Sequence, residues 1–299
     1  MVTGLRIAAF VGVGLLAVSC GADDCVDATV PLDALAGECT VVTYTPPTSG
    51  SAMRAMLCRP PEGEERFGGM VLVHGGGGNS GDPADVASWE VAYRDAGMTT
   101  LSIEYLLHDP ESGSATWPIP ESNVKAAVQF MRLHADELAL EDAQVLLHGF
   151  SAGARLGGIV ATTPGSSEFE SAELWPGVSD DVTSFIGFYG YYDGQQFEGD
   201  TYYADGAIPQ AAVAMDHADA MTGPVQLTHG DTDPIVPAQQ SVDFAAALED
   251  ADKEVNLTIV DDASTHVFDG YGEADITPKG EAAATEMIDW YESLIAGDS

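Results

Sequence analysis

Basic residues are scarce in this chain. Lys and Arg together number 10 against 48 Asp and Glu in 299 residues, which gives a formal net charge of −38. A surface of this sign repels phosphate groups, so the composition excludes nucleic acid as a ligand. Such a charge is typical of a solvated acidic surface in a secreted protein or in salty surroundings, where salt screens the repulsion. A second interpretation is the attraction of cationic substrates.

Long apolar runs are absent beyond the N-terminus, and no later stretch is long enough to cross a bilayer. The one such run, residues 7–18, follows Arg6 and has the length of a secretory signal. It closes on Ser19 and Cys20, which resembles the lipobox of bacterial lipoproteins and implies cleavage before Cys20, with lipid attached to that cysteine. An ordinary signal peptide is the alternative.

From this N-terminus we expect export. Residues 1–19 are the predicted signal peptide of lipoprotein type, residues 20–38 an acidic tether, and residues 39–299 a single α/β domain. The expected location is the cell envelope, with membrane contact through the lipid anchor. A periplasmic or secreted protein without lipid remains the other possibility.

Cysteines are few, but export makes a disulfide permissible. Strand-like segments at residues 38–44 and 53–57 flank a Pro-rich turn, and together they predict a β-hairpin. A hairpin centred on that turn would place Cys39 opposite Cys58, close enough for a bridge. Pairing of Cys25 with Cys39 is left open.

The remaining chain alternates between strand-like and helix-like segments. Short apolar runs indicate strands at residues 69–74, 99–104, 143–148, 182–188, 225–229 and 255–260, and helical spacing occurs at residues 85–96, 122–138, 239–249 and 281–295. We expect Ser122 to cap its helix. The alternation predicts a mostly parallel sheet with right-handed crossovers. Two polar, irregular stretches, around residues 162–181 and 193–222, are lid or pocket insertions or plain surface loops.

Residues 149–153 read Gly-Phe-Ser-Ala-Gly, between a predicted strand and a predicted helix. A serine in this position sits on a sharp turn that lifts its hydroxyl above the sheet. Glycines two residues to either side avoid a clash with the crowded backbone. An ordinary glycine-rich turn would also produce this pattern. The role of the serine therefore depends on which residues the rest of the chain places near it.

A serine hydroxyl needs a base, and the base needs a group to orient it. Two later strand ends offer these partners: Asp233 follows the strand at residues 225–229, and His266 follows the strand at residues 255–260. The order Ser151, Asp233, His266 matches that of the α/β hydrolases, whose acid usually stands three residues after a glycine. This selects Asp233 over Asp231, which we expect to form a turn.

Of the seven histidines, only His266 follows Asp233. We expect His148 and His229, at strand ends, to be packed and hydrogen-bonded, and His217 to lie at the surface.

The run His74-Gly75-Gly76-Gly77-Gly78 comes directly after the strand-like residues 69–73. It resembles the oxyanion loop of hormone-sensitive-lipase-like and BD-FAE-like carboxylesterases. The resemblance implies an α/β-hydrolase fold, with helices on both faces of a mostly parallel sheet and an N-terminal β-hairpin. It also implies that the N–H groups of Gly76, Gly77 and Ala152 form the oxyanion hole, with His74 packed beneath the loop.

By this resemblance the chain is a serine carboxylic-ester hydrolase of the EC 3.1.1 class. Ser151 would be the nucleophile, His266 the base and Asp233 the orienting acid, and the reaction would pass through an acyl-enzyme. We expect small or medium acyl esters as substrates, free or borne on polysaccharide. No cofactor or metal is implied, and the Cys and His spacing has no zinc pattern. A serine peptidase and a catalytically silent binding protein of the same fold are the alternatives.

Substrate choice depends on the pocket walls, which the two irregular stretches would supply. Six aromatic residues are candidates for these walls, although each could equally lie in the core: Trp175, Tyr189, Tyr191, Tyr192, Tyr202 and Tyr203.

Overall fold

The computed structural model describes residues 26–27, 32–46, 52–109, 111–112, 116–169, 175–194, 202–203 and 207–296. The predicted signal peptide, Cys20 and Cys25 lie outside the described residues. So does the tip of the predicted hairpin, together with parts of the two irregular stretches.

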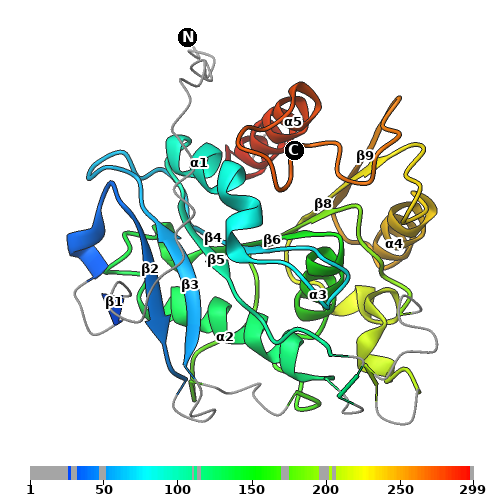
Figure 1. Ribbon diagram of the computed structural model, residues 1–299, viewed down its shortest axis with the longest axis horizontal. Helices are drawn as coiled ribbons and strands as arrows, with labels where there is room; N and C mark the ends of the chain where they lie inside the picture. The colour runs from blue at the N-terminus through cyan, green and yellow to red at the C-terminus, as the bar shows by residue number, and fades with distance from the viewer. Residues whose placement is uncertain are drawn as a thin grey trace.

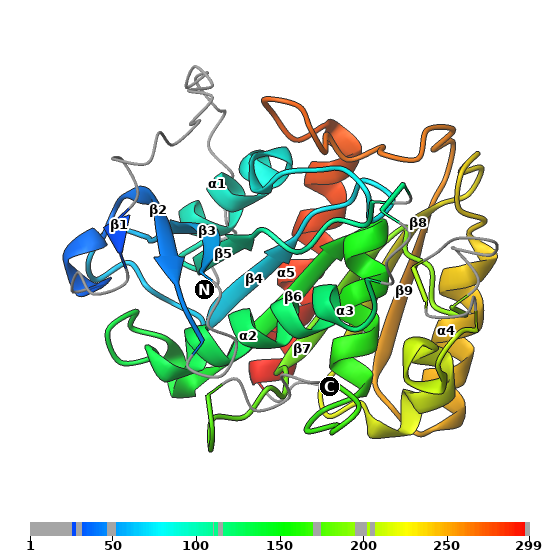
Figure 2. The ribbon, with the colours of Figure 1, turned by 60° about the horizontal axis from the view of Figure 1, so that its bottom comes forward.

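A nine-stranded sheet forms the centre of the protein, in the order β1-β2-β3-β5-β4-β6-β7-β8-β9 (Figures 1 and 2). Its strands are β1 Val26–Asp27, β2 Cys39–Tyr44, β3 Met53–Cys58, β4 Gly69–Val73, β5 Thr99–Ile103, β6 Val145–Phe150, β7 Ser184–Phe188, β8 Val225–Gly230 and β9 Val255–Val260. Strands β5, β4, β6, β7, β8 and β9 are parallel to their neighbours in that part of the sheet, while β3 runs antiparallel to both β2 and β5. The predicted α/β-hydrolase fold is confirmed.

Helices cover both faces of this sheet. The α-helices are α1 Ala87–Asp95, α2 Ile119–Leu133, α3 Ala152–Thr162, α4 Gln239–Asp250 and α5 Pro278–Ala296, and short 3-10 turns are η1 Leu32–Leu35, η2 Pro83–Val86, η3 Glu141–Ala143, η6 Gln210–Ala212 and η7 Ala214–Ala220. In Figure 1, α1 and α5 lie on the opposite side of the sheet from α2 and α3.

Alternating side chains of the central strands fill two cores. In β4, Val71 and Val73 pack in the core that includes residues of α2, α3 and α4, while Met70 and Leu72 pack in the core of α1 and α5. Successive side chains of a strand point to opposite faces, so a strand buried on both sides reads as one continuous apolar run. This explains why the sequence pattern located these strands well.

The N-terminal hairpin has the predicted register. Cys39 lies directly opposite Cys58 in the antiparallel β2–β3 pair, and the two cysteines form a disulfide. The predicted Cys39–Cys58 bridge is therefore confirmed, and pairing of Cys25 with Cys39 is excluded in this structure.

Two expectations differ from the structure near these elements. Part of the expected acidic tether is built into the fold: Leu32 is fully buried, and its carbonyl oxygen accepts a hydrogen bond from the Arg59 guanidinium at 2.7 Å.

The predicted cap at Ser122 is wrong, because α2 starts three residues earlier, at Ile119. Ser122 Oγ instead donates to the Pro118 carbonyl one turn back, and Pro120 occupies the first turn, where its missing N–H costs nothing.

The strand order changes direction at β4, which lies between β5 and β6. In open α/β sheets, ligands bind beyond the carboxyl ends of the strands near such a reversal. The glycine loop follows β4 and the Ser151 turn follows β6, so both meet at this edge of the sheet.

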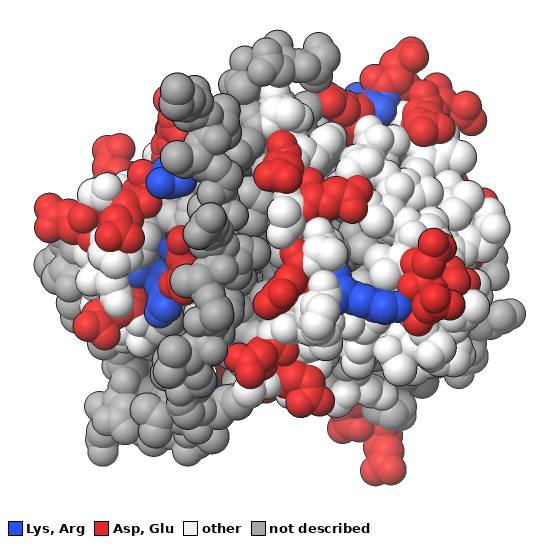
Figure 3. All heavy atoms as spheres, turned by 90° about the horizontal axis from the view of Figure 1, so that it is seen from above, with Lys and Arg blue, Asp and Glu red and all other residues white. Residues whose placement is uncertain are grey.

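Acidic side chains dominate the face shown in Figure 3, where Asp and Glu are scattered with few Lys or Arg between them. Three of the ten basic residues, Arg59, Lys125 and Arg155, are buried, and so are four acidic residues, so the surface keeps most of the negative charge. Among the helices of the described chain, none combines the length and apolar character that a membrane span requires.

Candidate active site

Ser151 sits in the turn between β6 and α3. Its backbone has φ 54° and ψ −115°, a conformation that residues with a side chain rarely adopt. The turn is held from the next strand, since the Ser151 N–H donates to the Phe188 carbonyl at the end of β7 at 2.9 Å. The side chain is 9% exposed and reaches solvent at the carboxyl edge of the sheet.

The two flanking glycines are required by close backbone contacts. A Cβ on Gly149 would lie 2.2 Å from the Gly153 carbonyl oxygen, and a Cβ on Gly153 would lie 2.0 Å from the Val73 carbonyl oxygen of β4. Such contacts are shorter than any real Cβ tolerates. The predicted steric reason for both glycines is therefore confirmed.

The structure brings Ser151, His266 and Asp233 together in one hydrogen-bonded chain. His266 Nε2 lies 2.8 Å from Ser151 Oγ, and His266 Nδ1 lies 2.6 Å from Asp233 Oδ2. Because a carboxylate only accepts, Nδ1 carries the proton and leaves Nε2 free to accept the serine proton. The His266 side chain is 11% exposed, while that of Asp233 is fully buried.

Asp233 is fixed by its own loop, which follows β8. Its Oδ1 accepts the backbone N–H groups of Ile235 and Val236, at 2.8 and 2.9 Å. Asp231 accepts the Ala263 N–H at 3.0 Å, so it ties the two loops together, as expected of a turn residue rather than of the acid facing His266.

His229 is packed and hydrogen-bonded beneath this loop, as predicted. Its Nε2 donates to the Val236 carbonyl at 3.0 Å, and its Nδ1 pairs with Ser241 Oγ at 2.8 Å. Burial lowers the pKa of His229. We conclude that the 3.4 Å contact between His229 and Asp233 joins a neutral ring and a carboxylate, and that it holds the acid loop in place.

His148 and His74 also fit their predicted settings, whereas His217, expected at the surface, is half-buried. His148 is fully buried, with Nδ1 2.8 Å from the Tyr93 hydroxyl. His217 is half-buried and bonds the Gln210 carbonyl. His74 is buried under the glycine loop and stacks on the Tyr105 ring, with centroids 4.3 Å apart.

Several carbonyl groups of the glycine loop are held by hydrogen bonds from residues outside the loop. Tyr105 Oη donates to the carbonyls of His74 and Gly75, at 3.0 and 3.2 Å, and His108 N–H donates to the Gly78 carbonyl at 2.7 Å. The loop also comes close to the nucleophile, because a Cβ on Gly75 would lie 3.2 Å from Ser151 Cβ. This packing orients the loop so that its N–H groups can face the site.

The predicted oxyanion donors are Gly76, Gly77 and Ala152. Among the described residues, no acceptor is bonded to the N–H groups of Gly76 and Gly77, and Ala152 is the first residue of α3, where an N–H has no partner within the helix. The Gly75 N–H is already taken, since it donates to the Tyr271 hydroxyl at 2.9 Å.

Sequence reasoning missed the residues that brace the His266 loop. Tyr189 Oη and Trp89 Nε1 both donate to the buried carboxylate of Asp269, each at 2.9 Å, and the Tyr189 ring packs edge-on against His266. Burial raises the pKa of Asp269. The one available signal in the sequence was Asp269 itself, an acidic residue among apolar neighbours three positions after His266. Its partners Trp89 and Tyr189 are too distant in sequence to be found from a local pattern.

Most of the aromatic candidates for the pocket walls belong to the core. Tyr189, Tyr192, Tyr202 and Tyr203 are at most 3% exposed, and Trp175 packs near Tyr44 and Phe130. Tyr191 is half-buried beside the acid loop, with its hydroxyl 3.2 Å from the Ile235 carbonyl. Of the six, Tyr202 lines a hollow next to Ala152.

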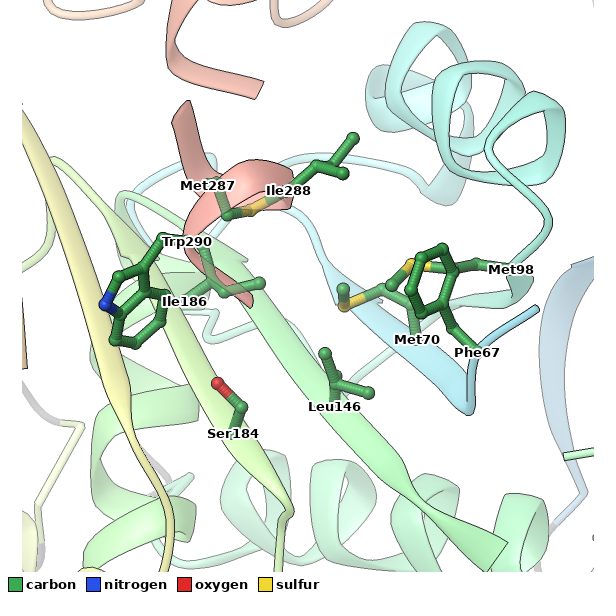
Figure 4. A pocket seen from close by; sticks show the side chains of 9 residues that line it. All are labelled: Phe67, Met70, Met98, Leu146, Ser184, Ile186, Met287, Ile288 and Trp290. Carbon is green, nitrogen blue, oxygen red and sulfur yellow. The ribbon is translucent and has the colours of Figure 1, made fainter. Parts of the chain in front are cut away.

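A separate apolar hollow lies away from these residues, between α5 and the sheet. Figure 4 shows Met287 and Ile288 of α5 above Met70 and Leu146 of the central strands. It contains no charged side chain and none of the Ser151, Asp233 or His266 loops. Within the described part of the chain, no cluster of three or more His, Cys, Asp or Glu has the arrangement of a metal site.

A Ser–His–Asp chain at the carboxyl edge of a mostly parallel sheet, beside a glycine loop, defines a protein of the α/β-hydrolase class. Within that class, the sequence pattern of one family, BD-FAE, matches residues 57–248, which is more than half of the chain. The chain belongs to the BD-FAE family.

Two proteins of Mycobacterium tuberculosis are similar in sequence. The protein named probable carboxylic ester hydrolase LipM is 24% identical over 222 residues, covering 68% of this chain and 49% of LipM. Esterase LipQ is 27% identical over 176 residues, covering 52% of this chain and 39% of LipQ. The chain thus matches about half the length, or less, of these relatives.

Solved structures show the same fold. The esterase Est2 of Thermogutta terrifontis with bound propionate superposes with a TM-score of 0.72 at 22% identity, covering 86% of this chain and 94% of Est2. A truncated carbohydrate esterase from gut microbiota gives a TM-score of 0.61 at 17% identity, covering 77% of this chain and 88% of the other.

Proposed function

We propose that this protein hydrolyses carboxylic esters with small or medium acyl groups, through an acyl-enzyme on Ser151. The observation that carries the proposal is the continuous hydrogen-bond chain from Ser151 Oγ through His266 to Asp233. A serine, a base within hydrogen-bond reach and a group orienting that base are the parts that nucleophilic catalysis requires.

In the first half of the reaction, Ser151 Oγ attacks the ester carbonyl carbon while its proton passes to His266 Nε2. The buried Asp233 carboxylate stabilises the imidazolium that forms. The negative charge on the carbonyl oxygen is accepted by the N–H groups of Gly76, Gly77 and Ala152, each worth about 3–4 kcal/mol of barrier. The C–O bond to the alcohol then breaks, and the alcohol oxygen takes the proton from Nε2.

In the second half, a water molecule gives a proton to His266 Nε2 and attacks the acyl carbon. The bond from that carbon to Ser151 Oγ breaks, Oγ recovers the proton, and the carboxylic acid leaves. The same three side chains and the same oxyanion donors therefore serve both halves, and the chemistry requires no cofactor.

The names of the similar proteins support an ester as substrate. LipM and LipQ are named as ester hydrolases, and Est2 is known with propionate bound and phosphorylated by paraoxon, an organophosphate. Because one neighbour is a carbohydrate esterase, esters carried on polysaccharide are included in the proposal.

Replacement of the nucleophile tests the proposed activity. In Ser151→Ala, turnover of p-nitrophenyl acetate should fall at least about 10³-fold, because the remaining site can only bind and polarise the ester. Thermal unfolding should show that the variant is folded. A wild type that cleaves peptide anilides but no ester would favour a serine peptidase, and one that binds esters without turnover would favour a silent binding protein.

The proposal also includes export and attachment to the cell envelope through a lipid on Cys20, on the strength of the apolar run that precedes this residue. Expressed in a bacterial host, the protein should incorporate labelled palmitate, and Cys20→Ala should not. Labelling that survives in Cys20→Ala would exclude this residue as the lipid site.

A further inference from the structure

A narrow hollow lies beside the nucleophile, at the start of α3. It is lined by Ala152, Arg155 and Leu156 of that helix, by Gly78 of the glycine loop and by Tyr202, among others. The hollow has no room for a water molecule. It therefore adjoins Ala152, one of the expected oxyanion donors, and its walls leave little free space.

The chemistry of the site decides which part of an ester faces this hollow. His266 Nε2 must reach the alcohol oxygen to give it a proton, so the alcohol lies on the His266 side. The hollow is lined by the glycine loop and α3, and no residue of the Asp233 or His266 loops contributes to it. The acyl group of a bound ester consequently points toward this hollow.

The wall formed by Tyr202 is held on several sides. Its hydroxyl donates to Glu121 Oε1 at 2.9 Å, its ring lies under the Arg155 guanidinium at 4.9 Å, and the His108 ring packs edge-on against it. Its carbonyl accepts the N–H groups of residues 116 and 117 as well. Since Tyr202 is only 1% exposed, its side chain cannot move to another rotamer without displacing its neighbours.

Behind the ring lies a buried ion pair, with Arg155 Nη1 3.1 Å from Glu121 Oε1 and both side chains at most 2% exposed. Burial raises the pKa of Glu121, and the Arg155 charge opposes that rise. Moving Tyr202 would remove two hydrogen bonds from this pair, one to Glu121 at 2.9 Å and one from Arg155 at 3.4 Å. Leaving buried charged groups with fewer hydrogen-bond partners is costly, so a long acyl chain cannot simply push the ring aside.

We propose that Tyr202, held by the Glu121–Arg155 pair, ends the acyl pocket and restricts the enzyme to acetyl-sized acyl groups. This inference rests on the proposed esterase function and narrows it. The methyl group of an acetyl ester sits at the mouth, against Ala152 and Gly78. Further carbons would have to occupy space that Tyr202 and Leu156 already fill.

The test uses p-nitrophenyl acetate, butyrate and hexanoate, which share one alcohol and differ only in the acyl group. For the wild type, kcat/KM on hexanoate should be at least about tenfold below that on acetate. In Tyr202→Ala, the hexanoate-to-acetate ratio should rise about tenfold, because the vacated space accepts the added methylenes.

Tyr203→Ala is the matched control. Tyr203 is the next residue, equally buried, and its hydroxyl bonds the same Arg155 guanidinium, but it does not line the hollow. Its ratio should stay at the wild-type value. Leu156→Ala enlarges the same hollow from α3 without touching the ion pair, and its ratio should also rise, so the inference can be judged even if Tyr202→Ala does not fold.

A wild type that hydrolyses hexanoate or methyl ferulate as fast as acetate would overturn the inference but leave the esterase function standing. A hexanoate-to-acetate ratio that stays at the wild-type value in both Leu156→Ala and folded Tyr202→Ala would also overturn the inference and leave the esterase function standing. A wild type that hydrolyses none of the esters would overturn the proposed function itself, and the inference with it.

Discussion

At the scale of single residues, the site depends on buried polar groups and on backbone conformations that are costly alone. Ser151 and Tyr189 both have positive φ, at the ends of neighbouring strands β6 and β7. Such conformations cost about 1–3 kcal/mol each and persist only where the surroundings impose them. Here the Ser151 N–H bonds the β7 end and the Tyr189 N–H bonds the Thr228 carbonyl of β8, so adjacent strands fix both residues.

His148, just before the Ser151 turn, should make stability depend on pH. Burial lowers its pKa well below 6.5, so below that pH the unfolded chain binds a proton that the folded protein does not. Its contribution to the free energy of unfolding therefore falls as pH falls. Between pH 7.5 and 5.5 we expect the wild type to lose about 1.4 kcal/mol relative to His148→Leu.

Urea unfolding of both proteins at pH 7.5, 6.5 and 5.5 measures this difference. Other titrating groups are common to the two proteins and cancel in the comparison. If the free energies of unfolding of wild type and His148→Leu differ by the same amount at all three pH values, His148 is protonated equally in the folded and unfolded states.

At the scale of helices and strands, the sequence located the candidate site because Ser151, Asp233 and His266 each follow a parallel strand of the sheet. A continuous apolar run identified β4, while apolar residues interrupted by polar ones indicated β6, β8 and the half-buried edge strand β9. The residues after these strands form the edge where the site lies. The hairpin register followed from the position of the turn between the two strand-like segments, which places Cys39 opposite Cys58. These features are local, so local patterns are sufficient to predict them.

What could not be predicted rests on contacts between distant segments. Tyr271 bonds the Gly75 N–H across 196 positions, and Asp269 meets Trp89 across 180. Most of the tyrosines expected in the pocket lie in the core, where partners such as Glu121 for Tyr202 and Asp269 for Tyr189 satisfy their hydroxyl groups. The α2 start was misplaced because Pro120 fits a first turn as well as Ser122 fits a cap.

The disulfide should stabilise the hairpin edge of the sheet. It links two residues separated by 19 positions, so its loss should lower the free energy of unfolding by about 3 kcal/mol. Urea unfolding of the Cys39→Ala, Cys58→Ala double variant measures the change. Turnover per folded chain should be unaffected, because β3 and β6 are separated by β5 and β4 in the sheet.

Reductant provides the control for this prediction. It should destabilise the wild type by a similar amount and leave the double variant unchanged. A double variant that unfolds at the wild-type urea concentration would show that the bridge adds no stability.

At the scale of the whole molecule, charge repulsion is the main unfavourable feature. The formal net charge is −38, and three of the ten basic residues are buried where they cannot offset surface carboxylates. Such repulsion weakens as salt shortens the Debye length from about 10 Å at 0.1 M to about 3 Å at 1 M.

We therefore expect Tm to rise by about 3 °C or more between 10 mM and 1 M NaCl, which corresponds to roughly 1 kcal/mol of added stability. Differential scanning calorimetry measures it. KCl should give the same rise, since screening depends on ionic strength and not on the cation. A Tm that stays constant or falls in both salts would exclude repulsion as a significant cost.

The central claim is that Ser151 is the nucleophile of an ester hydrolase, and covalent labelling tests it most directly. After treatment with paraoxon, we predict one diethylphosphoryl group per chain, located on Ser151 by peptide mass spectrometry, with turnover of p-nitrophenyl acetate lost in proportion to labelling. Turnover that persists with Ser151 fully labelled, or a label on another residue that accounts for the loss, would contradict the account.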